Sequence, residues 1–265
     1  MAILLSSGNY FGIEKKFNEH PLFKLNITHY APFECIHEHY HENAYLSLLI
    51  KGKYHELNQR SEGIMNPGEV ILRPSGYLHA NNFPETGGSC MNVEFKNDVL
   101  TTYGLRSVLP EKATTYKAGA FTYLYKLLYC FSNDLDPELS EEYIFNWLAE
   151  NENYPIPSRL LWLPKVKTIL ENELEIQHTL VSISERVFVH PVYLARAFRE
   201  REGLTPGEYK LKMRVKKSVE LLFNTKLSIS EIAYSTGFSD TAHFIKSFRL
   251  YYPVSPHKYR SVLKG

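Results

Sequence analysis

Between about Tyr30 and Phe95, short apolar runs alternate with turn-forming residues in a pattern typical of β-strands. The predicted strands are Ala44–Ile50, Lys53–Leu57, Val70–Leu72 and Met91–Phe95. Gly and Pro turns separate them at Lys51-Gly52, Asn66-Pro67-Gly68 and Pro74-Ser75-Gly76. Short, evenly spaced strands with such turns predict a small β-barrel or β-sandwich.

Beyond Pro110 the spacing of apolar residues changes to that of amphipathic helices. The first stripe consists of Ala120, Tyr123, Leu124, Leu127, Leu128 and Phe131. The second consists of Leu139, Tyr143, Ile144, Trp147 and Leu148. The polar segment from Asn151 to Pro157 contains two prolines and is the predicted linker to a helical C-terminal part.

The C-terminal part contains an internal duplication. The segment Tyr193–Tyr209 resembles the segment His243–Tyr259. Three residues of the first copy recur fifty positions later: Phe198, Pro206 and Tyr209 correspond to Phe248, Pro256 and Tyr259. A short predicted helix and a tight connection precede each copy, with Val181–Val187 before the first and Ser228–Ser235 before the second. Two short helices joined by a tight turn predict a helix-turn-helix unit.

The second helix of each unit has an apolar inner face and an outward face that carries cations. The inner residues are Leu194, Ala197 and Phe198, then Phe244, Ser247 and Phe248. The outward, candidate DNA-binding residues are Val192, Ala195, Arg196 and Arg199, then Thr241, Ala242, Ile245, Lys246 and Arg249. Small or apolar side chains can approach bases, and cations suit phosphates or guanine edges. Two solvated amphipathic helices would explain the cations but not the repeat.

A longer helix is predicted to start at Thr205-Pro206 and to run to about Asn224. At about 1.5 Å per residue it spans roughly 28 Å. Because successive major grooves on one face of DNA lie roughly 34 Å apart, one protomer could read two adjacent grooves.

The charge distribution agrees with a nucleic-acid partner for the C-terminal part. Residues 1–157 carry 12 Lys and Arg against 19 Asp and Glu, whereas residues 158–265 carry 18 against 10. A basic half behind an acidic half indicates that the second half meets a polyanion, although an accidental imbalance would look the same.

Composition and cysteine spacing narrow the class of protein. With 44% hydrophobic and 22% charged residues, the chain has the composition of a folded globular protein. Cys35, Cys90 and Cys130 are too widely spaced for a disulfide framework or a close-set zinc site, which predicts a reducing cytosol. The chain shows neither a signal peptide nor a long apolar run, so we expect a cytoplasmic protein that does not span a membrane.

Residues 160–265 resemble the DNA-binding domain of the AraC family of transcription regulators. The residues that carry the resemblance are His190-Pro-Val-Tyr-Leu-Ala-Arg-Ala-Phe-Arg199, Ser230-Glu-Ile-Ala233, Gly237-Phe-Ser-Asp240, His243-Phe244, Phe248 and Ser255-Pro256 through Tyr259-Arg260. The resemblance implies two helix-turn-helix units joined by a long helix. The chain departs from the family pattern at two turns: Pro253 stands where the first copy has Gly203, and Phe188 replaces a small residue.

Two segments of the N-terminal half resemble the motifs of the cupin barrel, a sensor fold that commonly precedes an AraC-type domain. They are His39-Tyr-His41 through Gly52, and Gly68-Glu-Val-Ile-Leu-Arg-Pro74-Ser-Gly76-Tyr-Leu-His79. In metal-binding cupins these motifs supply three His and one Glu. Here His39, His41 and His79 match the histidines, whereas Tyr45 stands at the Glu position.

These four residues are therefore the candidate effector pocket, and the three histidines are a candidate site for zinc, nickel, iron or copper. Histidine clusters also occur without a metal. An organic effector that hydrogen-bonds to the same residues is the alternative.

The prediction is a two-domain α+β protein. Residues 1–110 form a cupin-like β-barrel sensor, residues 111–157 form amphipathic helices and a linker, and residues 158–265 form an all-α DNA-binding domain. The expected function is effector-responsive transcription regulation on double-stranded DNA, with RNA polymerase as a further partner. The alternatives are a metal-dependent cupin enzyme and an adaptor that no longer binds DNA.

The AraC resemblance also implies a homodimer, because helices after the sensor barrel commonly pair in that family. Tyr116, Tyr123 and Trp147 are then the candidate contacts. Packing of these helices on their own barrel is the competing interpretation.

Overall fold

A computed structural model describes residues 2–58, 61–96, 109, 111–134, 137–150, 156 and 158–264. The chain divides into two compact units, Met1–Phe121 and Thr122–Gly265. The expected linker from Asn151 to Pro157 lies outside the described residues except for Ile156. Within the described part of the chain, every helix is too short or too polar to cross a bilayer.

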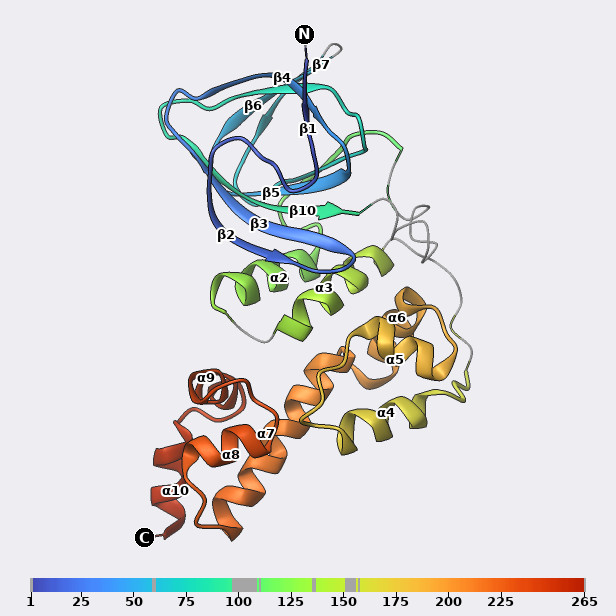
Figure 1. Cartoon of the computed structure of the whole chain (residues 1–265), viewed down its shortest axis with the longest axis vertical. Coiled ribbons are helices and arrows are strands. Elements are labelled where there is room, and N and C mark those ends of the chain that lie inside the picture. Colours follow the sequence, from blue (N-terminus) through green and yellow to red (C-terminus); the bar gives the residue numbers. More distant parts are fainter. Residues whose placement is uncertain are drawn as a thin grey trace. The chain divides into compact units, whose positions relative to one another are not determined.

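The first unit consists of two β-sheets (Figure 1). One sheet has the strand order β1-β4-β9-β6-β7, and the other has the order β11-β8-β5-β10-β3-β2. The strands are β1 (Ile3–Leu5), β2 (Ile13–Glu19), β3 (Phe23–Tyr30), β4 (Cys35–His41), β5 (Ala44–Gly52), β6 (Tyr54–Asn58), β7 (Ser61–Met65), β8 (Val70–Arg73), β9 (His79–Asn82), β10 (Gly88–Phe95) and β11 (Thr114–Tyr116). This confirms the expected β-rich N-terminal part.

The predicted strands correspond to β5, β6, β8 and β10. The region before Tyr30 was not predicted as strand, yet β2 and β3 form an antiparallel pair there. Most of β2 is exposed, so its sequence lacks an apolar run. The turn at Gly52 has a positive φ of 83°, and a Cβ there would lie 2.0 Å from the carbonyl oxygen of Gly87, so a side chain is excluded.

The second unit is helical. Its helices are α2 (Thr122–Ser132), α3 (Pro137–Ala149), α4 (Leu163–Asn172), α5 (Leu180–Val187), α6 (Pro191–Glu202), α7 (Pro206–Asn224), α8 (Ile229–Ser235), α9 (Thr241–Tyr251) and α10 (Pro256–Lys264). The long helix α7 begins and ends where the sequence predicts. Thr205 and Glu208 form a capping box at its start, and Ser228 and Glu231 do the same for α8.

The duplication is visible in the packing of the two helix-turn-helix units, α5–α6 and α8–α9, which α7 joins (Figure 1). The rings of Phe198 and Tyr209 are 5.6 Å apart at an interplanar angle of 83°, and those of Phe248 and Tyr259 are 5.5 Å apart at 72°. Both pairs are edge-to-face contacts between the second helix of a unit and the helix that follows it. Equivalent phenylalanine–tyrosine contacts therefore stabilise each of the two copies.

The boundary between the units differs from the three predicted segments. Helices α2 and α3 belong to the same compact unit as α4–α10. The reason is that α3 packs against α6 and α7. Its sequence shows an apolar stripe but does not reveal which helix covers it.

Candidate nucleic-acid interface and barrel site

The first helix-turn-helix unit has well-defined helix ends despite an unusual turn residue. The side chain of Thr179 caps α5 by accepting from the backbone N–H of Ser182. Phe188 ends that helix in the left-handed region with φ of 57°, although a side chain disfavours this conformation. Its ring is 92% exposed, so the conformation positions the following helix without adding to the core.

The candidate DNA-binding face of α6 is covered in this structure. Val192 and Ala195 are 0% exposed and Arg196 is 7% exposed. Arg199 is half-buried, and its guanidinium lies 4.9 Å from the ring centroid of Tyr123 on α2. The expectation that this face is open to solvent is wrong here, because α3 packs against α6.

The corresponding face of α9 has the expected exposure. Ala242, Lys246 and Arg249 are exposed, and Thr241 and Ile245 are half-buried. The inner residues Phe244, Ser247 and Phe248 are buried, as the helical spacing predicts. Asp240 fixes the start of α9 by accepting from the backbone N–H of His243 at 2.7 Å. Lys246 donates to the carbonyl oxygen of Asn133 at 2.9 Å.

The second helices of the two copies end differently, and Pro253 is the departure from the family pattern that separates them. Gly203 ends α6 in the left-handed conformation with φ of 70°. Before Pro253, by contrast, Tyr252 ends α9 in an extended conformation with φ of −129°. Proline restricts the preceding residue to such extended conformations. The two copies therefore leave their second helices along different backbone paths.

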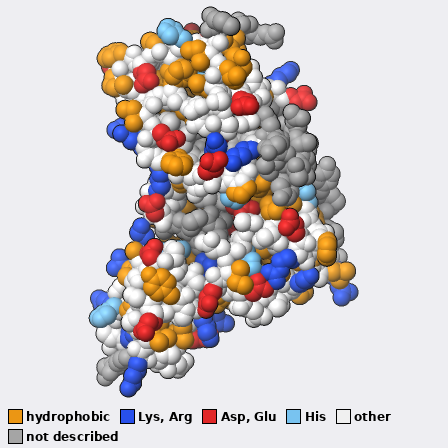
Figure 2. Space-filling view, in the orientation of Figure 1, with side chains coloured by type: hydrophobic (Ala, Val, Ile, Leu, Met, Phe, Trp, Pro, Cys, Tyr) orange, Lys and Arg blue, Asp and Glu red, His pale blue; other side chains and the backbone are white. Residues whose placement is uncertain are grey.

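The surface of the helical unit carries charges of both signs. On the face shown in Figure 2, Lys and Arg side chains alternate with Asp and Glu rather than gathering in one patch. On this face, positive and negative side chains are therefore interspersed.

The aromatic residues predicted as dimer contacts lie mostly inside the protomer. Trp147 is 1% exposed and Tyr123 is 8% exposed, while Tyr116 is half-buried. Tyr123 and Trp147 are therefore covered within the protomer, because α2 and α3 pack against each other and α3 packs on α6.

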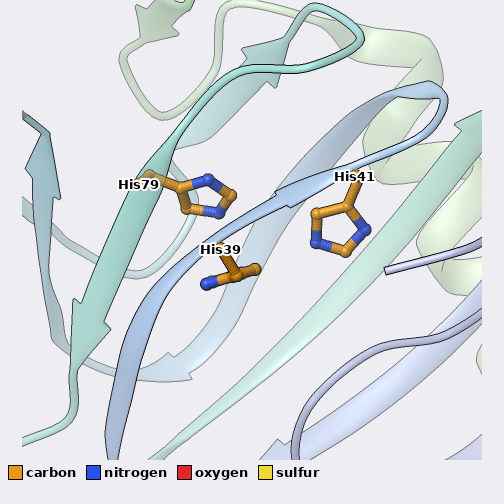
Figure 3. A group of neighbouring side chains, drawn as sticks. All are labelled: His39, His41 and His79. Atoms are coloured by element: carbon orange, nitrogen blue, oxygen red, sulfur yellow. The ribbon is translucent and has the colours of Figure 1, made fainter. Parts of the chain in front are cut away.

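In the first unit, the three predicted histidines meet in one buried cluster (Figure 3). His39 and His41 lie on β4, and His79 lies on β9, directly opposite His39 in the antiparallel pair. All three side chains are buried, and one nitrogen of each lies within 4.8 Å of the others.

Backbone carbonyls determine the tautomer of two of these rings. The Nδ1 atom of His39 lies 2.9 Å from the carbonyl oxygen of His37, and that of His79 lies 3.0 Å from the carbonyl oxygen of Tyr77. A carbonyl accepts only, so each Nδ1 carries the proton and each Nε2 keeps its lone pair. Metal-bound histidines are oriented in the same way. The phenol of Tyr45 lies 2.9 Å from Nε2 of His79 and donates to it.

Burial keeps the cluster uncharged. It lowers the pKa of His41 to about 3, and it also lowers the pKa of His39 and His79. The positive charge of Arg73 lowers all three pKa values further. Burial raises the pKa of Tyr45, so its phenol stays protonated. Neutral imidazoles at pH 7 are the form that binds metal ions.

The sequence analysis missed a buried ion pair beside this cluster. Arg73 on β8 makes two hydrogen bonds to Glu56 on β6, at 2.9 and 2.6 Å. It also donates to Tyr54 and Ser47, and Asn81 donates to Glu56. The pair joins the two sheets, because β8 and β6 belong to different ones. The sequence signal was a lone Arg at the end of the apolar run Val70–Leu72.

The cavity at this site is small. It measures about 20 Å³ and is lined by residues that include His39, His41, Tyr45, Arg73 and Asn92. This volume holds about one water molecule. Two of the three histidines, His39 and His41, and the arginine of the ion pair therefore line a space of about this size.

Comparison with known proteins identifies the helical unit. Residues 183–261, from within α5 to within α10, match a family model described as a helix-turn-helix domain. This segment is an AraC-type helix-turn-helix domain. The AraC-type domain thus contains both candidate recognition helices, α6 and α9.

Two relatives and a solved structure resemble the chain beyond this domain. The Msm operon regulatory protein of Streptococcus mutans is 34% identical over 207 residues, which cover 78% of this chain and 65% of that protein. The HTH-type transcriptional regulator ArgR of Pseudomonas aeruginosa is 28% identical over 158 residues, which cover 56% and 48%. The chain thus spans less than two thirds of either relative. ToxT from Vibrio cholerae O395 aligns over 93% of this chain and 100% of its own, with 15% identity and a TM-score of 0.36.

Proposed function

We propose that this chain is a cytoplasmic transcription regulator that binds double-stranded DNA through its AraC-type domain. The observation that carries the proposal is the face of α9, where Lys246 and Arg249 project from an exposed surface with Ala242 at its N-terminal end. A small residue lets the helix approach base edges, and the cations reach phosphates or guanines. The relatives named as transcriptional or operon regulators support the same conclusion.

Selection of bound duplexes from a random pool tests this function with the full-length chain. A specific site should emerge, and binding should weaken steeply as salt rises. Lys246→Ala should cost about 1–3 kcal/mol of binding free energy if it removes a base contact. Lys51→Ala removes the same charge from an exposed position in the first unit and is the control. Failure to enrich any sequence would contradict the proposal.

We also propose that the first unit is the sensor and that it binds a divalent metal ion such as zinc, nickel, iron or copper. His39, His41 and His79 would be the ligands. Neutral rings with defined tautomers suit this role. One nitrogen of each of the three rings lies within 4.8 Å of the others, so a single ion could bind all three. Metal-binding cupins have three His and one Glu ligand, and Tyr45 stands at the Glu position. The missing carboxylate favours a sensor over a cupin enzyme.

Metal analysis of protein purified without a nickel column tests the sensor proposal. One metal ion per chain is expected, and His79→Ala should lose most of it because His79 alone of the three comes from β9. His37→Ala is the control, since its exposed side chain belongs to the same strand as His39 and His41. Metal retained by His79→Ala would contradict the site. A thermal-shift screen of organic compounds would then test the alternative.

The two remaining partner proposals are a second copy of this chain, which would form a homodimer, and RNA polymerase bound near a regulated promoter. Tyr129 is exposed and Tyr125 and Leu128 are half-buried on one side of α2, so an apolar strip of this helix faces solvent. A specific interface through this strip should give a dimer at tens of micromolar in sedimentation experiments. A monomer at that concentration, or a dimer unchanged by Tyr129→Ser, would contradict this interface.

A further inference from the structure

The two copies of the duplication provide an internal control for the burial of α6. Val192, Ala195 and Arg196 correspond, fifty positions later, to Ala242, Ile245 and Lys246. The first three are buried, whereas the second three are exposed or half-exposed. A helix-turn-helix unit of this sequence therefore does not cover its own outward face. Among the helices outside the repeat, α3 packs on α6, whereas the contact with the outward face of α9 is the hydrogen bond from Lys246 to the carbonyl oxygen of Asn133.

Two neighbouring carboxylates attach α3 to the starts of two helices of the DNA-binding domain. Glu142 accepts from the backbone N–H of Gly207, the second residue of α7, at 2.6 Å. Glu141 accepts from the backbone N–H of Val181, the second residue of α5, at 3.3 Å. Both glutamates are buried. The N-terminus of a helix offers unpaired N–H groups and a positive dipole end, which is why DNA phosphates bind there.

Gly207 permits this close approach. A Cβ at this position would lie 2.7 Å from a carboxylate oxygen of Glu142 and 3.0 Å from Cδ2 of Leu139. Further contacts from α2 and α3 engage charged residues of the same domain. Lys126 pairs with Glu208 at 2.6 Å, and the phenol of Tyr143 donates to the same carboxylate.

We infer that α3 is an autoinhibitory mimic of DNA: it covers the base-reading face of α6 while Glu141 and Glu142 take the places of two phosphates. The inference rests on the proposed DNA-binding function. DNA and α3 cannot occupy the same face of α6 together, so the covered chain binds DNA through α9 alone. Release of α3 adds α6 to the interface.

The first test compares the full-length wild-type chain with Glu141→Ala/Glu142→Ala on a DNA site selected with the wild type. The variant should bind at least about tenfold more tightly. In the wild type, only the fraction of molecules with α3 released can use α6 to bind DNA, and this fraction limits the apparent affinity. Its footprint should lengthen by about one helical turn, roughly 10 base pairs. Glu175→Ala/Glu220→Ala makes the same change in net charge at exposed positions of the helical unit and is the control.

A second variant tests whether displacement of α3, rather than the loss of charge or a folding defect, changes DNA binding. Gly207→Ala leaves both glutamates in the chain, but its Cβ would lie 2.7 Å from a carboxylate oxygen of Glu142 and should displace α3. It should bind DNA more tightly and with the longer footprint, at unchanged helical content by circular dichroism. Gly63→Ala, where a Cβ would meet nothing within 4 Å, is the control. A folded Gly207→Ala or glutamate variant that binds like the wild type would overturn the inference. If no chain binds DNA while all are folded, the proposed function itself fails.

Discussion

Helices α6 and α9 arise from the same repeated sequence pattern, yet they differ in what covers them. In both helices the inner face is buried, and a phenylalanine on that face contacts a tyrosine of the following helix. The outward face of α6 is buried under α3, whereas that of α9 is exposed. The comparison shows that the repeat encodes the fold of each unit. Access to the candidate DNA-binding face depends on a helix outside the repeat.

The largest expected effect on stability concerns the buried phenylalanine that both copies contain. Phe198→Ala and Phe248→Ala should each destabilise the protein by about 3–5 kcal/mol, because each ring is fully buried and leaves a cavity. Chemical denaturation of the two variants measures this. Similar losses would confirm equivalent cores. A much smaller loss for one variant would show that only one copy depends on its aromatic pair.

The next effect concerns the covered face. Val192→Asp should cost more than about 2 kcal/mol of stability, because it removes the burial of a valine and places an unpaired charge there. Ala242→Asp, at the equivalent second position of α9, should change stability by less than about 0.5 kcal/mol, since that residue is exposed. Thermal unfolding of both variants in the absence of DNA measures the difference. Equal effects would show that α6 is not covered in solution.

A smaller effect concerns the helix starts. Asp240 caps α9, whereas His190, fifty positions earlier, makes no side-chain cap to α6. Asp240→Ala should therefore cost about 1 kcal/mol, and His190→Ala only a few tenths. Denaturation at pH 7 compares them. If the two substitutions cost the same, the cap is not what distinguishes the helix starts.

The cap also predicts a small pH dependence. The backbone N–H of His243 lowers the pKa of the Asp240 carboxyl. A lowered pKa in the folded state means that the cap contributes fully above the carboxyl's unfolded pKa of about 3.9 and is lost as the pH falls through the lower folded value. The difference in stability between wild type and Asp240→Asn should therefore shrink between about pH 4 and pH 2. A difference that is constant over this range would contradict the contribution of the carboxylate.

Much of the helical unit could be predicted because its signals are local. The start of α7 follows from Thr205 and Pro206, and its capping box follows from the spacing to Glu208. The histidines of the first unit were found through their motif spacing, and the structure brings all three together. Strand β2 was missed because most of its residues are exposed and give no apolar run.

The ion pair between Arg73 and Glu56 could not be predicted. The two residues are 17 positions apart, and they meet because the strands that carry them belong to opposite sheets. No local pattern indicates which buried arginine finds which carboxylate. The cavity size likewise depends on side chains from several strands of both sheets.

By itself, the sequence determined where the helices begin, which residues form the repeated cores and which cations face away from them. These features depend on spacing along one helix and on contacts between neighbours in the chain. The tertiary structure alone decided that α3 covers α6 and that α9 stays exposed. Burial is a property of the whole unit: Arg196 and Lys246 occupy equivalent positions, but Glu141 and Glu142 attach a further helix beside only the first of them.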